Sequence, residues 1–427
     1  MVDLFSKRQR VILFSLFACI LLVGCSSKSG GDSKEEIIID VFQFKVEFKE
    51  QFEELAKIYE EENPGIKINI DTVGGGTDYA STLKSKISSN DTPAIFNVGG
   101  PSEVNDYKDL LADLSDSKAA QAAYDATLTG VTVDGEILGL PYNQEGYGLI
   151  YNKQIFEEAG VDPSAISSFE DLETAVQKID SQKEDLGIEA VIAFPVKETW
   201  VTGEHLSNVF IAPEFDGDVI KTFESETVEF TKSDQMKAFI DLQNEYSVQP
   251  TISLDYSQQV EELFSTGKVA MIQQGNWVYS TIHEMDPDLA ENNLGILPIP
   301  LDGKMNLPVG VPMNWAVNKL KDDDIVEAAK DFLDWMYTSE TGKKFVLEEF
   351  KFIPAYEGYD ASLIADPLSK AVYEYADSGN TSGWVFGGYP SGWGQQILGA
   401  NIQKYIAEEA TWEEVVESSQ EAWKHSK

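Results

Sequence analysis

The chain has 427 residues, of which 42% are hydrophobic, 11% aromatic and 25% charged, a composition typical of folded globular proteins. Its 73 acidic and 32 basic residues leave a formal net charge of −41, which argues against a nucleic-acid partner and favours a soluble monomer. Only three His and two Cys are present, with no CxxC or HExxH motif and no His pair at the spacing of metal ligands. We therefore expect neither a metal centre nor a cofactor.

The N-terminus has the features of an export signal. Basic residues within the first ten positions precede an apolar run from Val11 to Val23, which is too short to span a bilayer as a helix but fits the hydrophobic region of a signal peptide. The run ends in Leu22-Val23-Gly24-Cys25, which resembles the lipobox of bacterial lipoproteins. That resemblance implies a signal peptide over residues 1–24 and a lipid on Cys25, followed by a polar tether over residues 25–36. We expect an exported protein, attached to the outer face of the cell membrane only through this lipid.

Strands and helices alternate in the first part of the remaining chain. Apolar residues at helical spacing, with glutamates on the opposite face, predict a helix over 48–59 that is terminated by Asn63-Pro64-Gly65. Apolar or alternating runs predict strands on either side of it. The expected strands are 37–44, 66–70 and 94–98, and a second helix is expected over 79–89. This order of elements indicates a three-layer α/β domain with a parallel sheet.

The same two patterns recur further along the chain, without an internal repeat. Asp134-Gly135 between short extended runs predicts a β-hairpin over 131–138, and residues 167–170 open a helix with a capping box. Other helices are expected around 233–246, 258–264 and 324–337, and strands around 149–152, 269–273, 295–297 and 315–318. Mixed α/β structure over this length fits two lobes.

Motifs for nucleotide binding and catalysis are missing or uninformative. Gly74-Gly75-Gly76 lacks the sequence context of a phosphate loop or a dinucleotide fingerprint, so we expect a flexible loop there. No G-x-S-x-G elbow accompanies any of the three His. His205 follows Trp200 in a polar stretch and could line a ligand pocket, although a His without such a role is the commoner case. Carboxylate pairs occur everywhere in so acidic a chain, so a glycoside hydrolase is left open.

Tryptophans outside amphipathic helices are the informative residues. Four of them stand beside Gly, Asn or Ser, whereas Trp335 lies in an apolar helical stripe and is expected in the core. A flat apolar ring stacks on the C–H face of a pyranose, while neighbouring amides and carboxylates bind its hydroxyls. The stretch 142–147 offers the same mixture of side chains, so these segments together favour a sugar ligand. The four segments are Gln274-Gly275-Asn276-Trp277, Pro312-Met313-Asn314-Trp315, Ser382-Gly383-Trp384 and Ser391-Gly392-Trp393-Gly394.

These residues belong to a longer pattern that resembles extracellular solute-binding proteins of family 1, the sugar-binding lipoproteins of ABC importers that include maltose-binding protein. The order and spacing of the matching stretches cover nearly the whole mature chain. They are Phe52-x-x-Leu55-Ala56-x-x-Tyr59-x-x-x-Asn63-Pro64-Gly65-Ile66-Lys67, Thr92-Pro93-Ala94-Ile95-Phe96, Leu110-Leu111-Ala112-Asp113-Leu114, Leu138-Gly139-Leu140-Pro141-Tyr142 with Leu149-Ile150-Tyr151-Asn152-Lys153, and Phe264-x-x-Gly267-Lys268-Val269-Ala270-Met271 leading to Gly275-Asn276-Trp277.

The resemblance implies an α/β, two-lobed periplasmic-binding-protein-like (type II) fold with a hinge and a ligand cleft between the lobes. It places the first lobe at residues 37–145 plus 299–339 and the second lobe at 146–298 plus 340–427. Trp277 and Trp393 match stacking aromatics of the second lobe. The expected ligand-binding residues are Gln43 in the loop after the first strand, Asn97 and Gly99 after the third, Tyr142, Glu145 and Tyr147 at the hinge face, and Trp200, Asn276, Trp277, Asn314, Trp315, Trp384 and Trp393.

The expected function is that of a non-enzymatic receptor that captures a carbohydrate, expected to be an oligosaccharide, outside the cell. Closure about the hinge would present the loaded protein to the transmembrane subunits of an ABC permease. The alternatives left open are a secreted glycoside hydrolase, a surface adhesin or scaffold, and a receptor for a peptide or polyamine. The scarcity of His and Cys disfavours a metal as cargo, and the richness in Trp disfavours a simple polyamine.

Overall fold

The computed structural model describes residues 36–73 and 79–426, and the region from Glu36 to Lys427 forms one compact unit. The expected signal peptide, Cys25, most of the tether and the Gly74-Gly75-Gly76 loop lie outside the described residues. No helix within the described ranges is long and apolar enough to cross a membrane. Two hydrophobic cores, each built around its own main β-sheet, organise the unit. We call these halves the first and the second lobe.

The sheet of the first lobe has five strands in the order β2-β1-β3-β12-β6. β1 is parallel to both β2 and β3, as the sequence predicts, and Val41 lies opposite Ile70 on one side and Ile95 on the other. β12 is antiparallel to β3 and to β6, so the chain returns to this sheet from a distant part of the sequence. The strands are β1 (Ile37–Gln43), β2 (Ile66–Thr72), β3 (Ile95–Val98), β6 (Leu140–Pro141) and β12 (Asn314–Val317).

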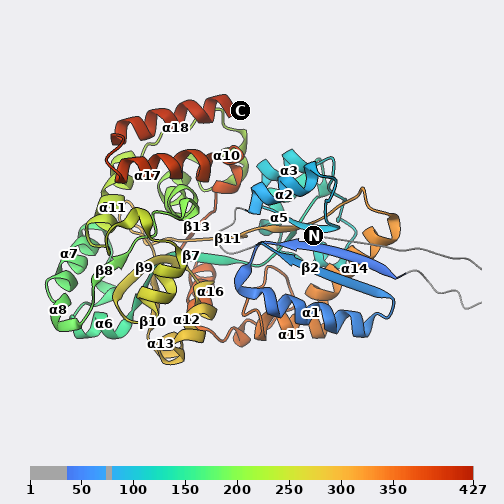
Figure 1. The fold of residues 1–427 in the computed structure, drawn as a ribbon, viewed down its shortest axis with the longest axis horizontal. Helices are drawn as coiled ribbons and strands as arrows, with labels where there is room; N and C mark the ends of the chain where they lie inside the picture. Colours follow the sequence, from blue (N-terminus) through green and yellow to red (C-terminus); the bar gives the residue numbers. More distant parts are fainter. Residues whose placement is uncertain (1–35, 74–78, 427) are drawn as a thin grey trace, which may run out of the picture. The chain divides into compact units, whose positions relative to one another are not determined.

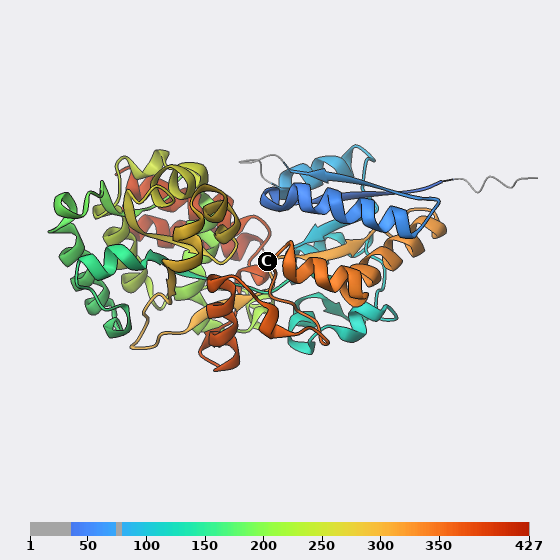
Figure 2. The same ribbon diagram turned by 90° about the horizontal axis from the view of Figure 1, so that it is seen from below.

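Helices complete the first core with their apolar stripes. In α1 the side chains of Phe52, Leu55 and Tyr59 are buried at helical spacing, on the face that the sequence predicts. α1 lies beside α14, where the indole of Trp335 donates to Glu62 at 2.8 Å and its ring packs half-buried against the core; the blue and orange helices adjoin in Figures 1 and 2. The helices are α1 (Lys49–Glu62), α2 (Tyr79–Ser88), α3 (Pro101–Tyr107), α4 (Lys118–Ala122), α5 (Asp125–Leu128), α14 (Asp323–Thr338) and α15 (Glu340–Glu348).

Two local predictions are confirmed by backbone geometry. β4 (Thr132–Val133) and β5 (Glu136–Ile137) form the expected hairpin, and Asp134 and Gly135 have φ of +53° and +89°, the left-handed pair that a two-residue type I′ turn requires. Ser168 caps the following helix by accepting the N–H of Asp171 at 3.1 Å. The second hydrogen bond of the capping box is made by the carboxylate of Asp171, which accepts the Ser167 N–H. It is not made by the glutamate that ends the predicted box.

The sheet of the second lobe is centred on β7, all eight residues of which are buried. Its strand order is β13-β11-β7-β9-β8, and β10 also pairs with β7. Tyr147 in β7 lies opposite Gly275 in the antiparallel β9, which brings the hinge face next to the start of the Asn276-Trp277 segment. The strands are β7 (Glu145–Asn152), β8 (Ala190–Ala193), β9 (Val269–Gly275), β10 (Leu294–Leu297), β11 (Leu307–Gly310) and β13 (Thr381–Ser382).

The second core is enclosed by helices, among which are three stretches of wider π-helix. Val201–Leu206 and Trp393–Gly399 lead into α9 and α17, and Gln258–Phe264 precedes β9. The α-helices are α6 (Lys153–Glu158), α7 (Phe169–Asp180), α8 (Lys183–Leu186), α9 (Ser207–Ile211), α10 (Val219–Glu224), α11 (Ser233–Glu245), α12 (Val278–Met285), α13 (Pro287–Asn292), α16 (Pro367–Asp377), α17 (Ala400–Ile406) and α18 (Trp412–Ser426). Short 3-10 turns in the two lobes occupy Val46–Phe48, Thr129–Val131, Pro163–Ala165, Ala212–Phe215, Thr251–Ser253, Ala361–Leu363 and Phe386–Gly388.

The chain passes between the lobes at three places within the described residues. The first is Asn143-Gln144, between β6 and β7. The second is at 311–313, whereas the family resemblance placed it at 298/299; β11 still belongs to the second sheet because it pairs antiparallel with β7. The third follows Tyr356, since Phe345, Phe350, Phe352 and Tyr356 still belong to the first core, although Leu347 and Ile353 in the same stretch pack in the second core. The resemblance had assigned everything from 340 onward to the second lobe.

Candidate functional site

A buried ion pair lies where the two lobes meet. The ammonium of Lys45, in the loop after β1, is 2.5 Å from a carboxylate oxygen of Glu145 at the start of β7, and 3.4 Å from Glu47. The Lys45 and Glu145 side chains are only 3% and 4% exposed. The ammonium also lies 6.0 Å from the ring centroid of Trp277 in the second lobe, so Lys45 contacts both lobes.

Burial and charge act against each other in this group. Burial lowers the pKa of the Lys45 ammonium, but Glu145 and Glu47 outweigh it and the net shift is upward. Burial raises the pKa of the Glu145 carboxyl, while Lys45 opposes that shift. The cation therefore stays charged and is already engaged by carboxylates of the protein itself.

Gln43 holds the loop that carries Lys45. Its amide nitrogen donates to the Lys45 carbonyl oxygen at 2.9 Å and to the Thr72 hydroxyl at 2.7 Å, and its amide oxygen accepts the Lys45 backbone N–H at 2.6 Å. The Tyr142 hydroxyl also donates to this oxygen at 3.4 Å. Gln43 was predicted as a ligand contact; the structure places it fully buried and hydrogen-bonded within the protein, where it positions Lys45.

Aromatic side chains of the second lobe gather around His205. The imidazole stacks on Tyr147 with centroids 4.4 Å apart and an angle of 12° between the rings. Centroids of four more rings, each at 5.2 to 5.5 Å, surround it. We call this group the aromatic cluster. Its members are Tyr147, Trp200, His205, Trp277, Trp384 and Phe386.

The imidazole at the centre of the aromatic cluster is neutral at physiological pH. Burial, and after it the positive charge of Lys45, lower the pKa of His205 to about 3. A neutral imidazole carries one N–H donor and one acceptor nitrogen, which suits it to a hydroxyl group. His205, which the sequence left open as a pocket residue, thus lies among the predicted aromatics.

The ring of Trp277 is held by a chain of hydrogen bonds. Its indole N–H donates to Gln274 at 2.9 Å, Gln274 donates to Gln259 at 2.8 Å, and Gln259 donates to the Ala193 carbonyl oxygen at 2.8 Å. All three amide and indole groups are buried. The orientation of Trp277 is therefore fixed through β9 and β8 before any ligand arrives, which reduces the entropy cost of binding to it.

A cavity of about 460 Å³ lies between the lobes, beside the aromatic cluster. The first lobe lines it with Gly99 to Pro101, residues 126–127 and 129–130, Gln144 and Asn314. The second lobe lines it with residues 217–219, 383–384 and 386–387, and residues 309–311 at the second crossing complete the wall. Asn314 Oδ1 and the Trp384 indole N–H are buried without a hydrogen-bond partner among the described residues. A volume in this range and a few unpaired polar groups on apolar walls are typical of small-molecule sites.

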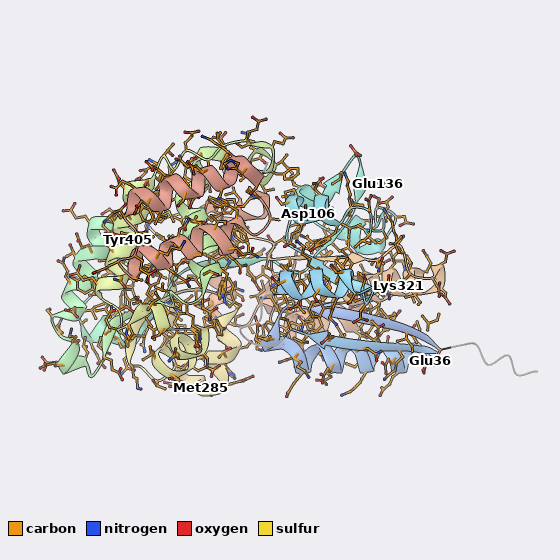
Figure 3. The ribbon with its side chains drawn as sticks, turned by 45° about the horizontal axis from the view of Figure 1, so that its top comes forward. Glu36, Asp106, Glu136, Met285, Lys321 and Tyr405 are labelled. Atoms are coloured by element: carbon orange, nitrogen blue, oxygen red, sulfur yellow. The ribbon has the colours of Figure 1, made fainter. Side chains whose placement is uncertain are left out.

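Direct contacts join the lobes at the edge of this cavity. The Ser102 hydroxyl in α3 donates to the Tyr389 carbonyl oxygen at 2.6 Å, in a buried position. At the surface the Ser391 hydroxyl donates to Asp106 at 2.5 Å; Asp106 is labelled in Figure 3. The structure is therefore that of lobes in contact.

The predicted site residues divide into those that reach the junction and those that do not. Gly99, Asn314 and Trp384 line the cavity, and Tyr147, Trp200 and Trp277 belong to the aromatic cluster. Asn97 is fully buried in β3, and both polar atoms of its side chain lack a partner among the described residues. Glu145 is paired with Lys45 as described above.

The remaining predicted residues are engaged inside the cores. Tyr142 and Trp315 stack on each other in the first core, with centroids 4.5 Å apart. Trp393 is 1% exposed in the second core, where its indole donates to the Ser419 carbonyl oxygen at 2.8 Å and its ring packs against Trp423. Asn276 accepts the Gly146 N–H at 3.0 Å and donates to Ser369, so it ties β9 to β7 and α16.

Sequence reasoning did not single out Lys45, Gln144 or Phe386. Lys45 directly follows the first predicted strand, so its place at the carboxyl end of a parallel strand was a signal that could have been used. Gln144 lies inside the 142–147 stretch that was singled out as a whole. Phe386 has no local signal, because only the packing of residues 383–387 against α10 and the cavity brings it beside His205.

A family model of bacterial extracellular solute-binding proteins matches residues 45–343. This range covers more than half of the chain, which therefore belongs to that family. The chain is also 23% identical over 353 residues to the melibiose/raffinose/stachyose-binding protein MelE of Bacillus subtilis, with 79% of each chain covered. It is 23% identical over 361 residues to the arabinooligosaccharide-binding protein of the same organism, covering 82% of this chain and 80% of the relative.

Solved structures share the fold over nearly the whole chain. A chitin oligosaccharide binding protein superposes with a TM-score of 0.78 at 23% identity, covering 92% of this chain and 99% of the other. A structure of the binding protein RafE in complex with raffinose gives a TM-score of 0.73 at 18% identity, covering 91% and 99%. The two-lobed α/β architecture of solute-binding proteins, which the sequence predicts, is thereby confirmed.

Proposed function

We propose that this protein is the extracellular receptor of an ABC importer and that it binds an oligosaccharide between its two lobes. The observation that carries the proposal is the aromatic cluster beside the cavity of about 460 Å³. Its rings provide apolar faces for pyranoses, and the unpaired groups of Asn314 and Trp384 provide an acceptor and a donor for hydroxyls. The names of the relatives, which bind melibiose, raffinose, stachyose or arabino-oligosaccharides, support this class of ligand.

Within the site we assign different roles to the side chains. Trp277, Trp384 and His205 form the wall on which sugar rings stack, and the half-buried ring of Trp200 adjoins this wall. From the first lobe, Asn97, Asn314 and Gly99 provide polar contacts. Tyr142, Trp315, Trp393, Asn276 and Gln43 act as structural supports.

Hinge closure is the proposed mechanism. The crossings at Asn143-Gln144, at 311–313 and after Tyr356 would form the hinge, with lobe boundaries at these positions. A ligand in the cavity contacts groups of both lobes at once, and such contacts exist only when the lobes are close together. Ligand binding would therefore stabilise the contact between Ser102 and Tyr389. The transmembrane subunits of the permease would recognise the surface formed in this way.

The location and the non-catalytic role are parts of the same proposal. Cleavage before Cys25 and its acylation would attach a monomeric protein to the outer face of the cell membrane through a polar tether. No group of three or more His, Cys, Asp or Glu that could hold a metal ion occurs within residues 36–73 and 79–426. At the lobe junction the Lys45 ammonium and the Glu145 carboxylate pair with each other. We infer that the ligand is delivered unchanged.

Thermal unfolding against a panel of ligands tests this function. The chain from residue 26 suffices, because residues 36–427 contain both cores. The panel holds melibiose, raffinose, stachyose, arabino-oligosaccharides and chitin oligosaccharides, with peptides and polyamines for comparison. A ligand at a hundred times its Kd adds about 2.7 kcal/mol to the folded state. One sugar family is expected to raise Tm and to be recovered intact by chromatography.

Two outcomes would contradict the proposal. If the stabilising sugar is recovered as shorter fragments, the protein is a glycosidase. If only a peptide or a polyamine raises Tm, it is a receptor of another class.

A further inference from the structure

The distribution of arginine in this chain is extreme. Both arginines, Arg8 and Arg10, lie in the first ten residues, and residues 11–427 contain none. The arginine guanidinium is the side chain that binds carboxylate, phosphate and sulfate groups through two parallel hydrogen bonds. Apart from histidine, lysine is therefore the only cationic side chain that could meet an anion between the lobes.

Among the residues that the structure describes, the walls of the cavity offer no lysine either. Of these described lining residues, Asp218 alone is ionisable, and it contributes a carboxylate. Its Oδ1 accepts the N–H groups of Ile220 and Lys221 at the start of α10. The Lys221 ammonium is exposed and pairs with Asp216 at 2.7 Å.

The cation at the junction is already neutralised. Lys45 is held by Glu145 at 2.5 Å and Glu47 at 3.4 Å, and two carboxylates exceed the charge of one ammonium. His205, at the centre of the aromatic cluster, adds no positive charge. The site thus combines apolar rings and neutral hydrogen-bonding groups with an excess of negative charge, inside a protein whose formal net charge is −41.

We propose, on the basis of the function proposed above, that the ligand of this site is an uncharged oligosaccharide, and that the site rejects sugars carrying a carboxylate, phosphate or sulfate group. A neutral sugar needs only stacking and hydroxyl contacts, which the aromatic cluster and Asn314 supply. An acidic sugar would lose its hydration on entering the cavity, find no cation to replace it, and meet the carboxylate of Asp218. Charge is therefore the first filter of specificity.

A matched pair of ligands tests the filter. The neutral oligosaccharide that stabilises the protein in the panel is compared with the same oligosaccharide in which one hydroxymethyl group is oxidised to a carboxylate. Isothermal titration with the chain from residue 26, at low ionic strength, is expected to give about tenfold to hundredfold weaker binding for the acidic form. The difference should shrink as salt is added, because salt screens like-charge repulsion.

The variant Asp218→Asn tests whether the Asp218 carboxylate causes the weaker binding of the acidic sugar. Asn is as good a helix cap as Asp, so the variant should fold, and the ratio of the acidic to the neutral Kd should fall severalfold relative to the parent. Asp162→Asn is the matched control, because Asp162 also caps a turn, with Ser164 N–H at 2.9 Å, but does not line the cavity. This control should leave both affinities unchanged.

The outcomes separate this inference from the function on which it rests. Equal affinity for the neutral and the acidic ligand, at every salt concentration, overturns the charge filter and leaves the sugar receptor standing. An acidic sugar that binds more tightly overturns the filter in the same way. If no sugar of either kind binds, the proposed function itself fails. An unchanged penalty in Asp218→Asn refutes the role assigned to that carboxylate.

Discussion

Trp277 and Trp393 have the same kind of sequence context but different surroundings in the fold, which makes them a sharp test of the site. Trp277→Ala would remove a ring that is 8% exposed and lies 6.0 Å from the Lys45 ammonium. We expect ligand binding to weaken by about 1–3 kcal/mol, or roughly 5- to 150-fold in Kd, because a large apolar surface is lost from the wall of the site. Isothermal titration at a temperature well below unfolding measures this.

Trp393→Ala is the matched control for that experiment. Trp393 is 1% exposed, and its ring packs against Tyr389 and Trp423 in the second core. Its truncation should cost about 3–5 kcal/mol of unfolding free energy in urea, while the folded fraction binds sugar with unchanged Kd. Trp393→Phe serves the same purpose if the Ala variant does not fold. Parent-like affinity in Trp277→Ala, or lost binding in a folded Trp393 variant, would refute the assignment.

Three further predictions concern charge, pH and lobe contact. Lys45→Met leaves the buried Glu145 without its cation and should cost about 3–5 kcal/mol of stability. The double variant with Glu145→Leu should restore most of this loss. Urea unfolding measures both variants, and an undiminished loss in the double variant would contradict the pairing. The pKa of His205 is lowered to about 3 by burial and then by Lys45. Below about pH 6.5 the unfolded chain takes up a proton at this imidazole, whereas the folded chain does not. The contribution of the neutral His205 to stability is therefore complete above pH 6.5 and is lost as the pH falls towards 3, by at most about 1.4 kcal/mol per pH unit. His205→Gln should flatten this part of the profile relative to the parent, and identical profiles would refute it. A Cβ on Gly100 would lie 3.0 Å from the Cα and the carbonyl oxygen of Gly387, so Gly100→Ala should force a small adjustment of the lobe contact and weaken sugar binding. Isothermal titration against the parent measures this, and an unchanged Kd would show that the contact yields without cost.

Local patterns predicted most elements of the fold because the information lies within a few residues. The apolar stripe of α1 and the alternation along β2 predicted both elements close to their observed bounds. The Asp134-Gly135 pair predicted its hairpin because few other residues adopt two consecutive left-handed conformations. The positions of the lobe crossings have no such local signal, since β11 belongs to the second sheet only through its pairing with β7.

The sequence predicted what kind of ligand the site would bind, but not which residues would form the site. Asn, Gly and Trp segments indicated a sugar site, and Trp277 and Trp384 do lie at the lobe junction. Trp393 has the same Gly and Ser neighbours, yet α18 covers it in the second core. A sequence neighbourhood specifies backbone flexibility and polarity, but not which distant helix packs on a ring.

The sequence by itself determined the family, the alternation of strands and helices, and the acidity of a chain without arginine after residue 10. These properties follow from composition and short-range order, which do not change on folding. The tertiary structure alone decided that Lys45 meets Glu145 and that His205 lies at the centre of the aromatic cluster. Lys45 and Glu145 lie a hundred positions apart, and every ring around His205 except that of Trp200 is more than fifty positions away from it in the sequence. Only tertiary packing brings such residues together.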